Sequence, residues 1–570
     1  MNRTQLSVMN EILTTINEKI DPDIKIEVDN ANAPAIVSPI AVDDIAAGIF
    51  ATFGGIAATL GRMRGLPPQS LSINRRHAGN SLNSIAWHFQ NKYQLDLSPV
   101  HTDINGFFPT ADSRHVIYNG AYPHLREIVL QYLGCPNKRS MIADATAKHN
   151  AADLERELSE LGACVAVVRD RSEWARHEQG QYLATVGVVE LVKVAEGAPV
   201  PLPTGSRILS GIKVLDLTKV IAGPTAGRQF AEHGADVIHL SHPYQDLIYA
   251  MDIDTSYGKT NAYLDFARER DRDVLVDLIK DADIFLSGYR YGALERHGFG
   301  VEDVVKINRN IINLRMNAYG FGGPWAKRRG YEQLAQSITG AAAIQGGSLT
   351  APRLVPAYVN DYLSGYLGAL GAMAALMKRA REGGSWLVRV SLARTCMFAL
   401  EHGLGAHDTP LPGDISELQP WMMDQEGQLG LMTRLAPVIA YSHTPAYAAI
   451  AGTAPGSHLP RWGHIKDAGV VPHYPTRVFK DLRLLKRDEV NLNRFGIPIC
   501  GTTPRSRALF NLTPYGSGAP ICPAFYAGLW PLASMTFAIR LADQISALDR
   551  RFGNRGLCLT GMSSRGVIVD

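Results

Sequence analysis

The sequence predicts an α/β protein whose main domain is built on a parallel β-sheet. Three observations support this prediction: 570 residues exceed what one hydrophobic core serves, strand and helix patterns alternate in the middle of the chain, and a proline-rich linker precedes that alternation. Hydrophobic residues make up 46% and charged residues 19% of the chain, as is typical of a globular protein. We therefore expect two or more domains.

The linker is Ala195–Ser206, which carries three prolines between two patterned segments. After it, short apolar runs that suit buried strands alternate with helical patterns. This alternation predicts a Rossmann-like parallel sheet domain with helices on both faces. The expected strands are Lys213–Leu217, Asp236–Leu240, Asn261–Phe266, Ile284–Tyr289 and Ile311–Asn317, and the expected helices are Thr225–His233, Arg268–Asp281 and Val301–Ile307.

Outside this domain the pattern is less regular. Gly106–Cys135 predicts a β-hairpin with a polar turn at Ala111–Ser113, followed by a helix. We expect four parts: an N-terminal helical region (1–100), a smaller α+β domain (101–200), the sheet domain (205–465) and a C-terminal extension (466–570). The sequence assigns no role to the extension, in which a helix is predicted near Ala533–Leu548.

The N-terminal region repeats a segment of the sheet domain. Ala41–Gly65 aligns with Tyr358–Glu382 at a constant offset of 317, which places Asp44 on Asp361. Small residues recur at helical spacing in both segments. Two unrelated Ala/Gly-rich helices are the alternative, but the shared Asp, shared glycines and constant register favour duplication. We predict that the first segment is a degenerate copy of the second.

Composition argues against several classes of function. A net charge of +3, from 57 basic and 54 acidic residues, does not indicate binding to nucleic acid or to an anionic membrane. The six cysteines are scattered, and the histidines show no metal-ligand spacing, so no metal is expected. The best candidate membrane span, Val355–Met377, carries Asn360 and Asp361, and we expect it to be a packed helix in a cytoplasmic protein.

The loop after the first strand of the sheet domain is a candidate ligand site, because doubly wound sheets bind ligands at the carboxyl ends of their strands. Its sequence, Thr218–Arg228, is not G-x-G-x-x-G, so a nicotinamide site is not expected. Gly223 and Gly227 near the start of the following helix still let a ligand approach the backbone closely.

Six segments in this part of the chain together resemble the family III CoA-transferases (the CaiB/BaiF family), which include formyl-CoA transferase, carnitine CoA-transferase and α-methylacyl-CoA racemase. They occur in the family's order along the sheet domain: GIKVLDLTKVIAGPTAGRQFAEHGADVIHL, YLDF, ADIFLSGYRYGALERHGFG, INLRMNAYGFGGPW, RRGYEQLAQSITG and VNDYLSGYLGALGAMAALMKRAREGGSWLVRVSL. A small domain ahead of the sheet domain resembles the rearranged fungal and bacterial members.

The resemblance implies that Asp361, in YVNDYLSG, is a nucleophile that attacks an acyl-CoA thioester. An anhydride and then an Asp-linked CoA thioester would follow, and a carboxylic acid would accept the CoA. A helix N-cap is the alternative role for Asp361. Asp44 stands too near the start of the chain for a sheet of its own to precede it, so it is expected to be a structural relic. The residues that match the family's CoA-binding positions are Val220, Ala222, Lys259, Gly288, Tyr289 and Arg296.

Three alternatives are compared by particular residues. The racemase branch has a histidine where this chain has Tyr331, whose ordinary pKa is too high for a base at neutral pH, so CoA transfer is favoured over racemisation. Thr260 and Asn317 replace basic residues of the family, which keeps open a paralogue that binds CoA or a partner without catalysis. The resemblance also implies a homodimer, and CoA acts as a substrate with no permanently bound cofactor.

Overall fold

The computed structural model describes residues 1–97, 102–290, 292–411, 415–463, 559–563 and 566–569. Residues Met1–Thr502 group into one unit and Thr503–Asp570 into a second. In the second unit, β18 (Leu559–Ser563) pairs antiparallel with β19 (Gly566–Val569). The helix predicted near Ala533–Leu548 and most of the predicted extension lie outside the described residues. The four-part division of the chain stays a prediction.

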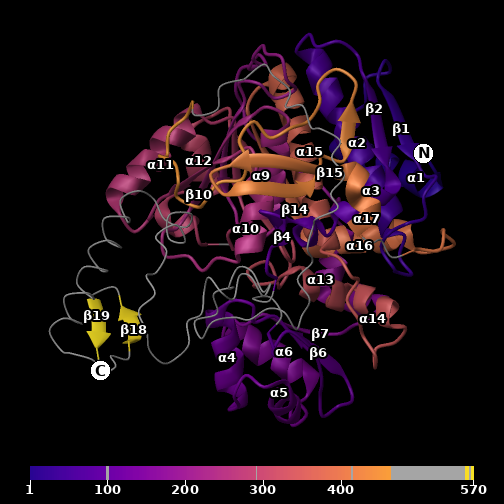
Figure 1. The fold of residues 1–570 in the computed structure, drawn as a ribbon, viewed down its shortest axis with the longest axis vertical. Helices are drawn as coiled ribbons and strands as arrows, with labels where there is room; N and C mark the ends of the chain where they lie inside the picture. The colour runs from indigo at the N-terminus through magenta and orange to yellow at the C-terminus, as the bar shows by residue number, and fades with distance from the viewer. Residues whose placement is uncertain (98–101, 291, 412–414, 464–558, 564–565, 570) are drawn as a thin grey trace. The chain divides into compact units, whose positions relative to one another are not determined.

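A seven-stranded sheet is the centre of the first unit, and the prediction of an α/β fold is confirmed (Figure 1). Its first six strands are parallel, and their interiors are buried because helices cover both faces. The strands run in the order β11 (Thr260–Tyr263), β10 (Asp236–Ser241), β9 (Lys213–Leu217), β12 (Ile284–Ser287), β13 (Ile312–Asn317), β14 (Ser385–Ser391) and β8 (Glu190–Ala195).

The seventh strand is an antiparallel addition to the predicted parallel sheet. β8 pairs antiparallel with β14 at one edge, and it lies before the linker in the sequence. Its side chains alternate between half-buried and exposed, as expected for an edge strand that is covered on one face. The sequence pattern did not predict this strand.

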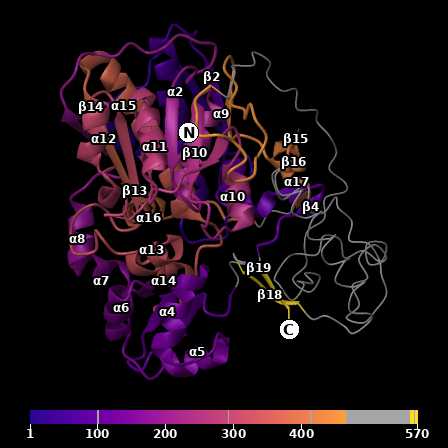
Figure 2. The same cartoon turned by 90° about the vertical axis from the view of Figure 1, so that its left-hand side faces the viewer.

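Helices cover the two faces of the sheet. On one face α9 (Ala222–Glu232) lies against β9, β10 and β12, and the 24-residue α15 (Val359–Glu382) lies against α9, β13 and β14. On the other face α11 (Glu269–Asp281) and α12 (Val301–Ile307) bury Leu275 and Val304 in a second apolar cluster (Figure 2). Helices therefore flank the sheet as the sequence predicts.

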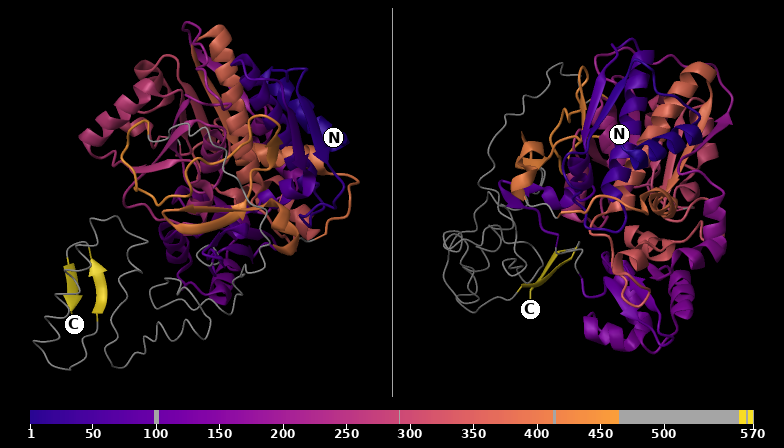
Figure 3. Two further views of the ribbon diagram at one scale, coloured as in Figure 1. Left: turned by 45° about the horizontal axis from the view of Figure 1, so that its top comes forward. Right: turned by 90° about the vertical axis from the view of Figure 1, so that its right-hand side faces the viewer.

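The N-terminal region adds a second, smaller sheet to the same unit. Its helices are α1 (Arg3–Ile16), α2 (Val42–Met63) and α3 (Arg75–Ser81), and its sheet has the order β1 (Lys25–Asp29), β2 (Ser70–Asn74), β17 (Ile439–Tyr441). β1 and β2 are parallel, whereas β17 is antiparallel to β2. Figure 3 shows this indigo region packed beside the orange helices α15 and α16 (Leu392–Gly403).

The predicted repeat has matching secondary structure in both copies. Helix α2, strand β2 and helix α3 follow one another as α15, β14 and α16 do. Both long helices begin at the same repeat position, both strands end at the same position, and both following helices begin there. The matched pairs, which all keep the offset of the repeat, are Val42 with Val359, Asn74 with Ser391, and Arg75 with Leu392.

α2 is the one helix in the described part of the chain that is long and apolar enough to cross a membrane. The predicted candidate, Val355–Met377, is not the segment that meets this test. All of the apolar window of α2 is buried inside the protein, where it packs against α1, α3 and α15. Burial of this kind is typical of a core helix, and such a helix is weak support for a membrane span.

The small domain contains the predicted hairpin. β5 (Gly106–Pro109) and β6 (His115–Tyr118) are antiparallel, and Ser113 in the turn has a φ of 59°. β7 (Val165–Val167) adds a third strand to this sheet, and α4 (Pro123–Leu133), α5 (Arg139–Thr146) and α6 (Ala151–Glu160) cover it. The sheet also contacts α13 (Glu332–Thr339) of the sheet domain.

The remaining elements connect or border these parts. They are η1 (Ser84–Trp87), β3 (Phe89–Gln90), β4 (Tyr93–Gln94), α7 (Arg171–Arg176), α8 (Glu178–Ala184), α10 (Tyr249–Thr255), η3 (Glu295–His297), α14 (Ala341–Gly346), α17 (Ile415–Leu418), η4 (Gln419–Trp421), β15 (Met422–Gly427) and β16 (Gly430–Leu435). β15, β16, β3 and β4 form a separate four-stranded sheet.

Candidate active site

Asp361 lies in the first turn of α15, where it is 6% exposed. The N-cap of this helix is Tyr358, three residues earlier, and no side chain caps the helix. The Asp361 carboxylate forms no hydrogen bond or ion pair with the described residues, so the N-cap alternative is wrong. A nearly buried carboxylate without a partner is unusual, and it is available to react.

Glu332 is the neighbour that determines the electrostatics of Asp361. It is the first residue of α13, where its Oε1 accepts hydrogen bonds from the Asn360 backbone N–H at 3.1 Å and from Gln336 Nε2 at 2.8 Å. Its Oε2 has no hydrogen-bond partner in the described part of the chain. Burial and then the charge of Glu332 raise the pKa of Asp361 well above its ordinary value, and burial raises the pKa of Glu332.

The two carboxyl groups therefore titrate as a pair, because both cannot easily be ionised in a buried site. Sequence reasoning missed Glu332, although this residue stands directly after Tyr331 in the segment that matches the family. Its acidic side chain within a segment that matches the family was the available signal. The pairing itself depends on two helix starts that meet only in the folded chain.

Tyr331 lies beside this pair. Burial raises the pKa of its hydroxyl well above the ordinary value for tyrosine. Its ring lies 6.3 Å, centroid to centroid, from the ring of Tyr122 in the small domain. Tyr331 is therefore a neutral hydroxyl at physiological pH, so it cannot act as the base that a racemase would need at this position.

Asp44, the equivalent of Asp361 in the N-terminal copy, has a different environment. Its Oδ1 accepts hydrogen bonds from Asn2 Nδ2 at 2.7 Å and Gln5 Nε2 at 3.0 Å, and Arg75 lies at 3.5 Å. These groups hold the carboxylate in place through Oδ1. Asp44 thus has the contacts of a structural residue, whereas Asp361 does not.

The loop that the sequence assigns to CoA approaches the start of α15. Val220 has a φ of 70°, a left-handed conformation that is strained for a β-branched residue and is found mainly at functional sites. Ala222 is the first residue of α9. A Cβ added at Gly365 of α15 would lie 2.7 Å from the Ala222 carbonyl oxygen, so glycine at position 365 lets the two helices meet.

Lys259 is buried, with 1% of its surface exposed. Its ammonium group donates hydrogen bonds to Asp216 Oδ2 and to the Pro224 carbonyl oxygen, both at 2.7 Å. Burial alone would raise the pKa of Asp216, but Lys259 and His239 hold that pKa below its ordinary value. Lys259 therefore joins β9 to the first turn of α9. That it also binds a CoA phosphate stays a prediction.

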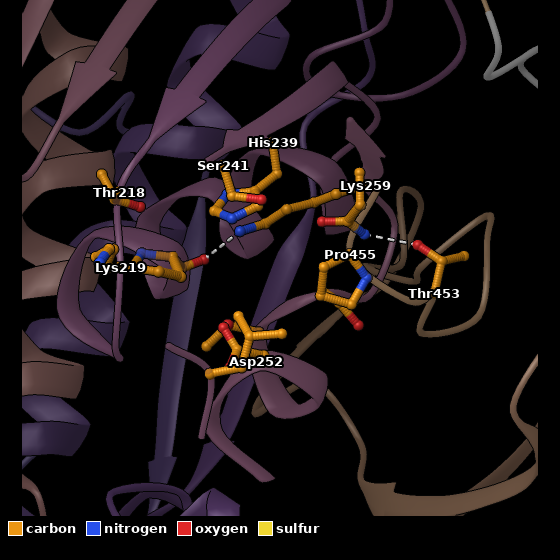
Figure 4. A pocket seen from close by; sticks show the side chains of 13 residues that line it. Thr218, Lys219, His239, Ser241, Asp252, Lys259, Thr453 and Pro455 are labelled. Carbon is orange, nitrogen blue, oxygen red and sulfur yellow. Dashed lines mark hydrogen bonds between the residues drawn. The ribbon is translucent and has the colours of Figure 1, made fainter. Parts of the chain in front are cut away.

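A pocket opens at the carboxyl ends of β9 and β10, where a doubly wound sheet usually binds its ligand, and beside the start of β11 (Figure 4). Burial raises the pKa of Asp252, in the wall of this pocket, to about 6. Asn261 closes one side of the pocket through a 2.6 Å hydrogen bond to Thr453. The other lining residues include Thr218, Lys219, His239, Ser241, Lys259 and Pro455.

Gly288, Tyr289 and Arg296 follow β12, next to this pocket. The Gly288 N–H donates to the Leu217 carbonyl oxygen at 3.3 Å, which brings Gly288 beside the first loop. Burial raises the pKa of Tyr289 to about 12. Arg296 lies exposed on η3. The structure thus groups Val220, Ala222, Lys259 and Gly288 around β9, with Tyr289 and Arg296 farther along the chain.

Basic residues that sequence reasoning missed supplement this set. Partial burial and the charges of Arg329 and Arg296 lower the pKa of Arg290, so each of these two guanidinium groups lies near that of Arg290. Arg329 donates a hydrogen bond to the Gly162 carbonyl oxygen of the small domain at 2.8 Å. Lys219 extends over the ring of Tyr122, 5.9 Å from its centroid. Clustered cations of this kind suit phosphate groups.

Comparison with known proteins identifies the segment that carries this site. The sequence profile of CoA-transferase family III matches residues 209–442, which contain the seven-stranded sheet except for β8 and also contain Asp361 and Glu332. The resemblance to CoA-transferase family III that was read from the sequence is thus confirmed for this segment.

Several curated proteins are similar to parts of the chain. An acetyl-coenzyme A transferase (nodX) of Hypoxylon pulicicidum is 30% identical over 381 residues, covering 58% of this chain and 64% of the relative. An acyl-CoA transferase of Gibberella moniliformis is 31% identical, covering 50% and 53%. A formyl-CoA:oxalate CoA-transferase of Streptomyces coelicolor is 30% identical, covering 33% and 48%. The chain thus spans less than two thirds of each relative.

Among solved structures, Rv3272 of Mycobacterium tuberculosis is 28% identical to this chain. The match covers 34% of this chain and 56% of that protein, with a TM-score of 0.33.

Proposed function

We propose that this protein is a CoA-transferase that moves coenzyme A from an acyl-CoA donor to a carboxylic acid through covalent intermediates on Asp361. The observation that carries the proposal is the Asp361 carboxylate itself, which is nearly buried, has no hydrogen-bond partner among the described residues and lies beside Glu332. The resemblance assigns the nucleophile's position to Asp361, and the profile of CoA-transferase family III matches the segment that contains it.

The proposed reaction begins when one Asp361 oxygen attacks the thioester carbonyl. The acyl group passes to Asp361 as a mixed anhydride, and CoA leaves as a thiolate. The thiolate then attacks the Asp361 carbonyl carbon, forming an aspartyl-CoA thioester and releasing the donor acid. The acceptor carboxylate attacks this thioester, and returning CoA thiolate cleaves the new anhydride at the acyl carbon, which regenerates Asp361.

The contacts of the site support particular roles for its residues. The first loop with Val220 and Ala222 places backbone near the start of α15, where the thioester would lie. The cations Lys219, Arg290, Arg296 and Arg329 would bind the CoA phosphates. The names of the relatives suggest first substrates: acetyl-CoA and formyl-CoA as donors and oxalate as an acceptor. The homodimer implied by the resemblance stays a prediction.

The test is to trap the aspartyl-CoA thioester. The protein is incubated with acyl-CoA donors, treated with hydroxylamine or borohydride, digested and analysed by mass spectrometry. We expect the modification at Asp361, none in Asp361→Asn, and normal labelling of Asp361 in the matched control Asp44→Asn. Labelling elsewhere would contradict the proposal.

Two alternatives have distinct outcomes in the same experiment. CoA binding without any trapped thioester, over a broad panel of acyl-CoAs, would favour the non-catalytic paralogue. Exchange of an α-proton with deuterated solvent in the absence of an acceptor acid would favour a racemase. The neutral Tyr331 hydroxyl argues against this alternative, because a racemase needs a base at that position.

A further inference from the structure

The two copies of the repeated unit contact each other in a reciprocal way. The Tyr358 backbone N–H, at the start of α15, donates to the Leu82 carbonyl oxygen at 3.0 Å. At the other end, the Ala41 N–H, at the start of α2, donates to the Gly403 carbonyl oxygen at 2.9 Å. Ala41 is the repeat equivalent of Tyr358, and Gly403 corresponds to position 86. In each copy, the end of the shorter helix (α3 or α16) therefore contacts the start of the other copy's long helix.

The two long helices also contact each other through equivalent stretches. The Phe50 ring of α2 lies 4.1 Å from the Tyr366 ring of α15, centroid to centroid, and Tyr366 corresponds to position 49. Equivalent stretches of the two helices thus meet near their middles. An interface in which residue i of one unit contacts residue j of the other, and the converse, is what a two-fold axis produces between identical subunits.

We propose that the N-terminal copy takes the place of a second subunit within the same chain, and that its Leu82–Ile85 segment positions the Asp361 nucleophile. The pairing follows from the reciprocal contacts, and the positioning role rests on the proposed function.

The positioning role follows from contacts on both sides of Asp361. Leu82 holds Tyr358 before it, and the Ile85 backbone N–H donates to the Tyr362 hydroxyl oxygen after it at 3.1 Å. The Tyr362 hydroxyl in turn donates to Asp254 Oδ2 at 2.8 Å, and Ser84 Oγ donates to Asp254 Oδ1 at 2.6 Å. The first turn of α15 is thereby fixed at both ends by residues of the N-terminal copy.

The equivalent set of hydrogen bonds is incomplete at the start of α2, in the other copy. Position 45, the equivalent of Tyr362, is an isoleucine, which has no hydroxyl to accept or donate a hydrogen bond. A Cβ added at Gly403 would lie 2.6 Å from Ile45 Cδ1, so only apolar contact occurs there. The hydrogen bonds through a tyrosine hydroxyl are thus present next to Asp361 and absent next to Asp44.

The first test is the mass of the purified full chain by size-exclusion chromatography with light scattering. Because the two-fold contact is made within the chain, we expect particles of one chain, 62.1 kDa, at micromolar concentration. Particles of two chains would support the homodimer instead and overturn pairing within the chain.

The second test compares two substitutions on α15. Tyr362→Phe keeps the ring and removes the hydroxyl that links Ile85 to Asp254. Tyr366→Phe is the matched control one turn later, because the Tyr366 hydroxyl forms no hydrogen bond with described residues. We expect Tyr362→Phe to slow formation of the Asp361-linked thioester at least tenfold while the Kd for CoA changes less than twofold, and Tyr366→Phe to change neither.

A merely structural role for Tyr362 would lower CoA affinity and melting temperature together and leave the rate of the folded fraction intact, which would overturn the positioning role. Equal rates in Tyr362→Phe and the unsubstituted chain would also overturn it. If the unsubstituted chain forms no thioester, the proposed function fails, and the light-scattering mass still decides whether the copies pair within one chain.

Discussion

At the scale of single residues, burial of Asp361 has two opposing effects on its reactivity. A poorly solvated carboxylate is a stronger nucleophile when ionised, but burial and Glu332 favour its protonated form. The rate of thioester formation should therefore fall in acid with an apparent pKa above the ordinary range for aspartate, and that pKa belongs to the pair.

Glu332→Gln tests this coupling, because the amide keeps the size of the side chain and removes its charge. The rate of Asp361 thioester formation, measured against pH, is expected to keep its plateau to a lower pH, since the pKa of Asp361 falls when the neighbouring charge is removed. Glu332→Asp, which retains the charge, is the control. An acid limb at the same pH in Glu332→Gln would contradict the coupling.

The same substitution has a predicted sign for stability. A carboxyl whose pKa is raised in the folded state contributes stability in acid that is lost as the pH rises above its ordinary value of about 4. Glu332→Gln should therefore be more stable than the unsubstituted chain at pH 8, by about 1–3 kcal/mol on the scale of one to two pKa units. The difference should vanish near pH 4, as measured by thermal unfolding at each pH.

The position of Asp361 was predictable from the sequence because a motif fixes it, whereas its pairing was not. Glu332 and Asp361 lie on separate helices and meet through the starts of α13 and α15. The N-cap alternative was physically reasonable for an Asp ahead of a helix. The helix begins earlier than that alternative requires, and this backbone detail decides against it.

At the scale of elements, buried strands were predicted well because continuous apolar runs identify them. The bounds of three strands, β9, β10 and β13, lie within a residue of those expected. Those of helix α12 match the expected bounds as well. β11 ends at Tyr263, earlier than expected, because Tyr263, opposite Ser241, is the last residue that pairs with β10. β8 was missed because its six residues mix exposed and half-buried positions, which gives no apolar run.

Two lysines near the first loop have different expected roles. Lys259 is expected to be structural, and Lys219 is expected to bind the ligand. Lys259→Met would leave Asp216 as a buried charge without its main partner, so we expect a loss of about 3–5 kcal/mol in the free energy of unfolding. Lys219→Met, at an exposed position in the pocket, should change stability by less than about 0.5 kcal/mol and weaken CoA binding.

Chemical unfolding and isothermal titration with CoA measure the two effects. The double variant Lys259→Met with Asp216→Leu should recover part of the lost stability, because it removes the unpaired charge. If Lys259→Met instead keeps the free energy of unfolding of the unsubstituted chain and loses only CoA affinity, the result contradicts the structural role of Lys259. It then supports the prediction that Lys259 binds a CoA phosphate.

At the scale of the whole molecule, the order of the parts was harder to predict than the parts themselves. The sequence indicated a linker between the small domain and the sheet domain, yet β8, just before that linker, completes the main sheet. β17, at the end of the segment that the family profile matches, completes the N-terminal sheet instead. Such pairings between distant segments leave no periodic signal, so local patterns cannot assign them.

The position of the site predicts the effect of removing the second unit. The proposed catalytic and CoA-binding residues all lie between Lys219 and Asp361, within the unit Met1–Thr502. A chain that ends at Thr502 is therefore expected to form the Asp361 thioester at the rate of the full chain. Trapping and circular dichroism on both chains measure this, and loss of the thioester in a folded shortened chain would refute it.

The burial of α2 has a consequence for synthesis of the protein. This 22-residue apolar helix is covered in the folded state by α15, which begins only at Val359. At about 5–20 residues per second, a ribosome needs roughly 15–60 s to make that cover. During this interval the nascent chain carries a segment that resembles a membrane anchor. We therefore expect ribosome-associated chaperones that shield such segments to raise the yield of folded protein.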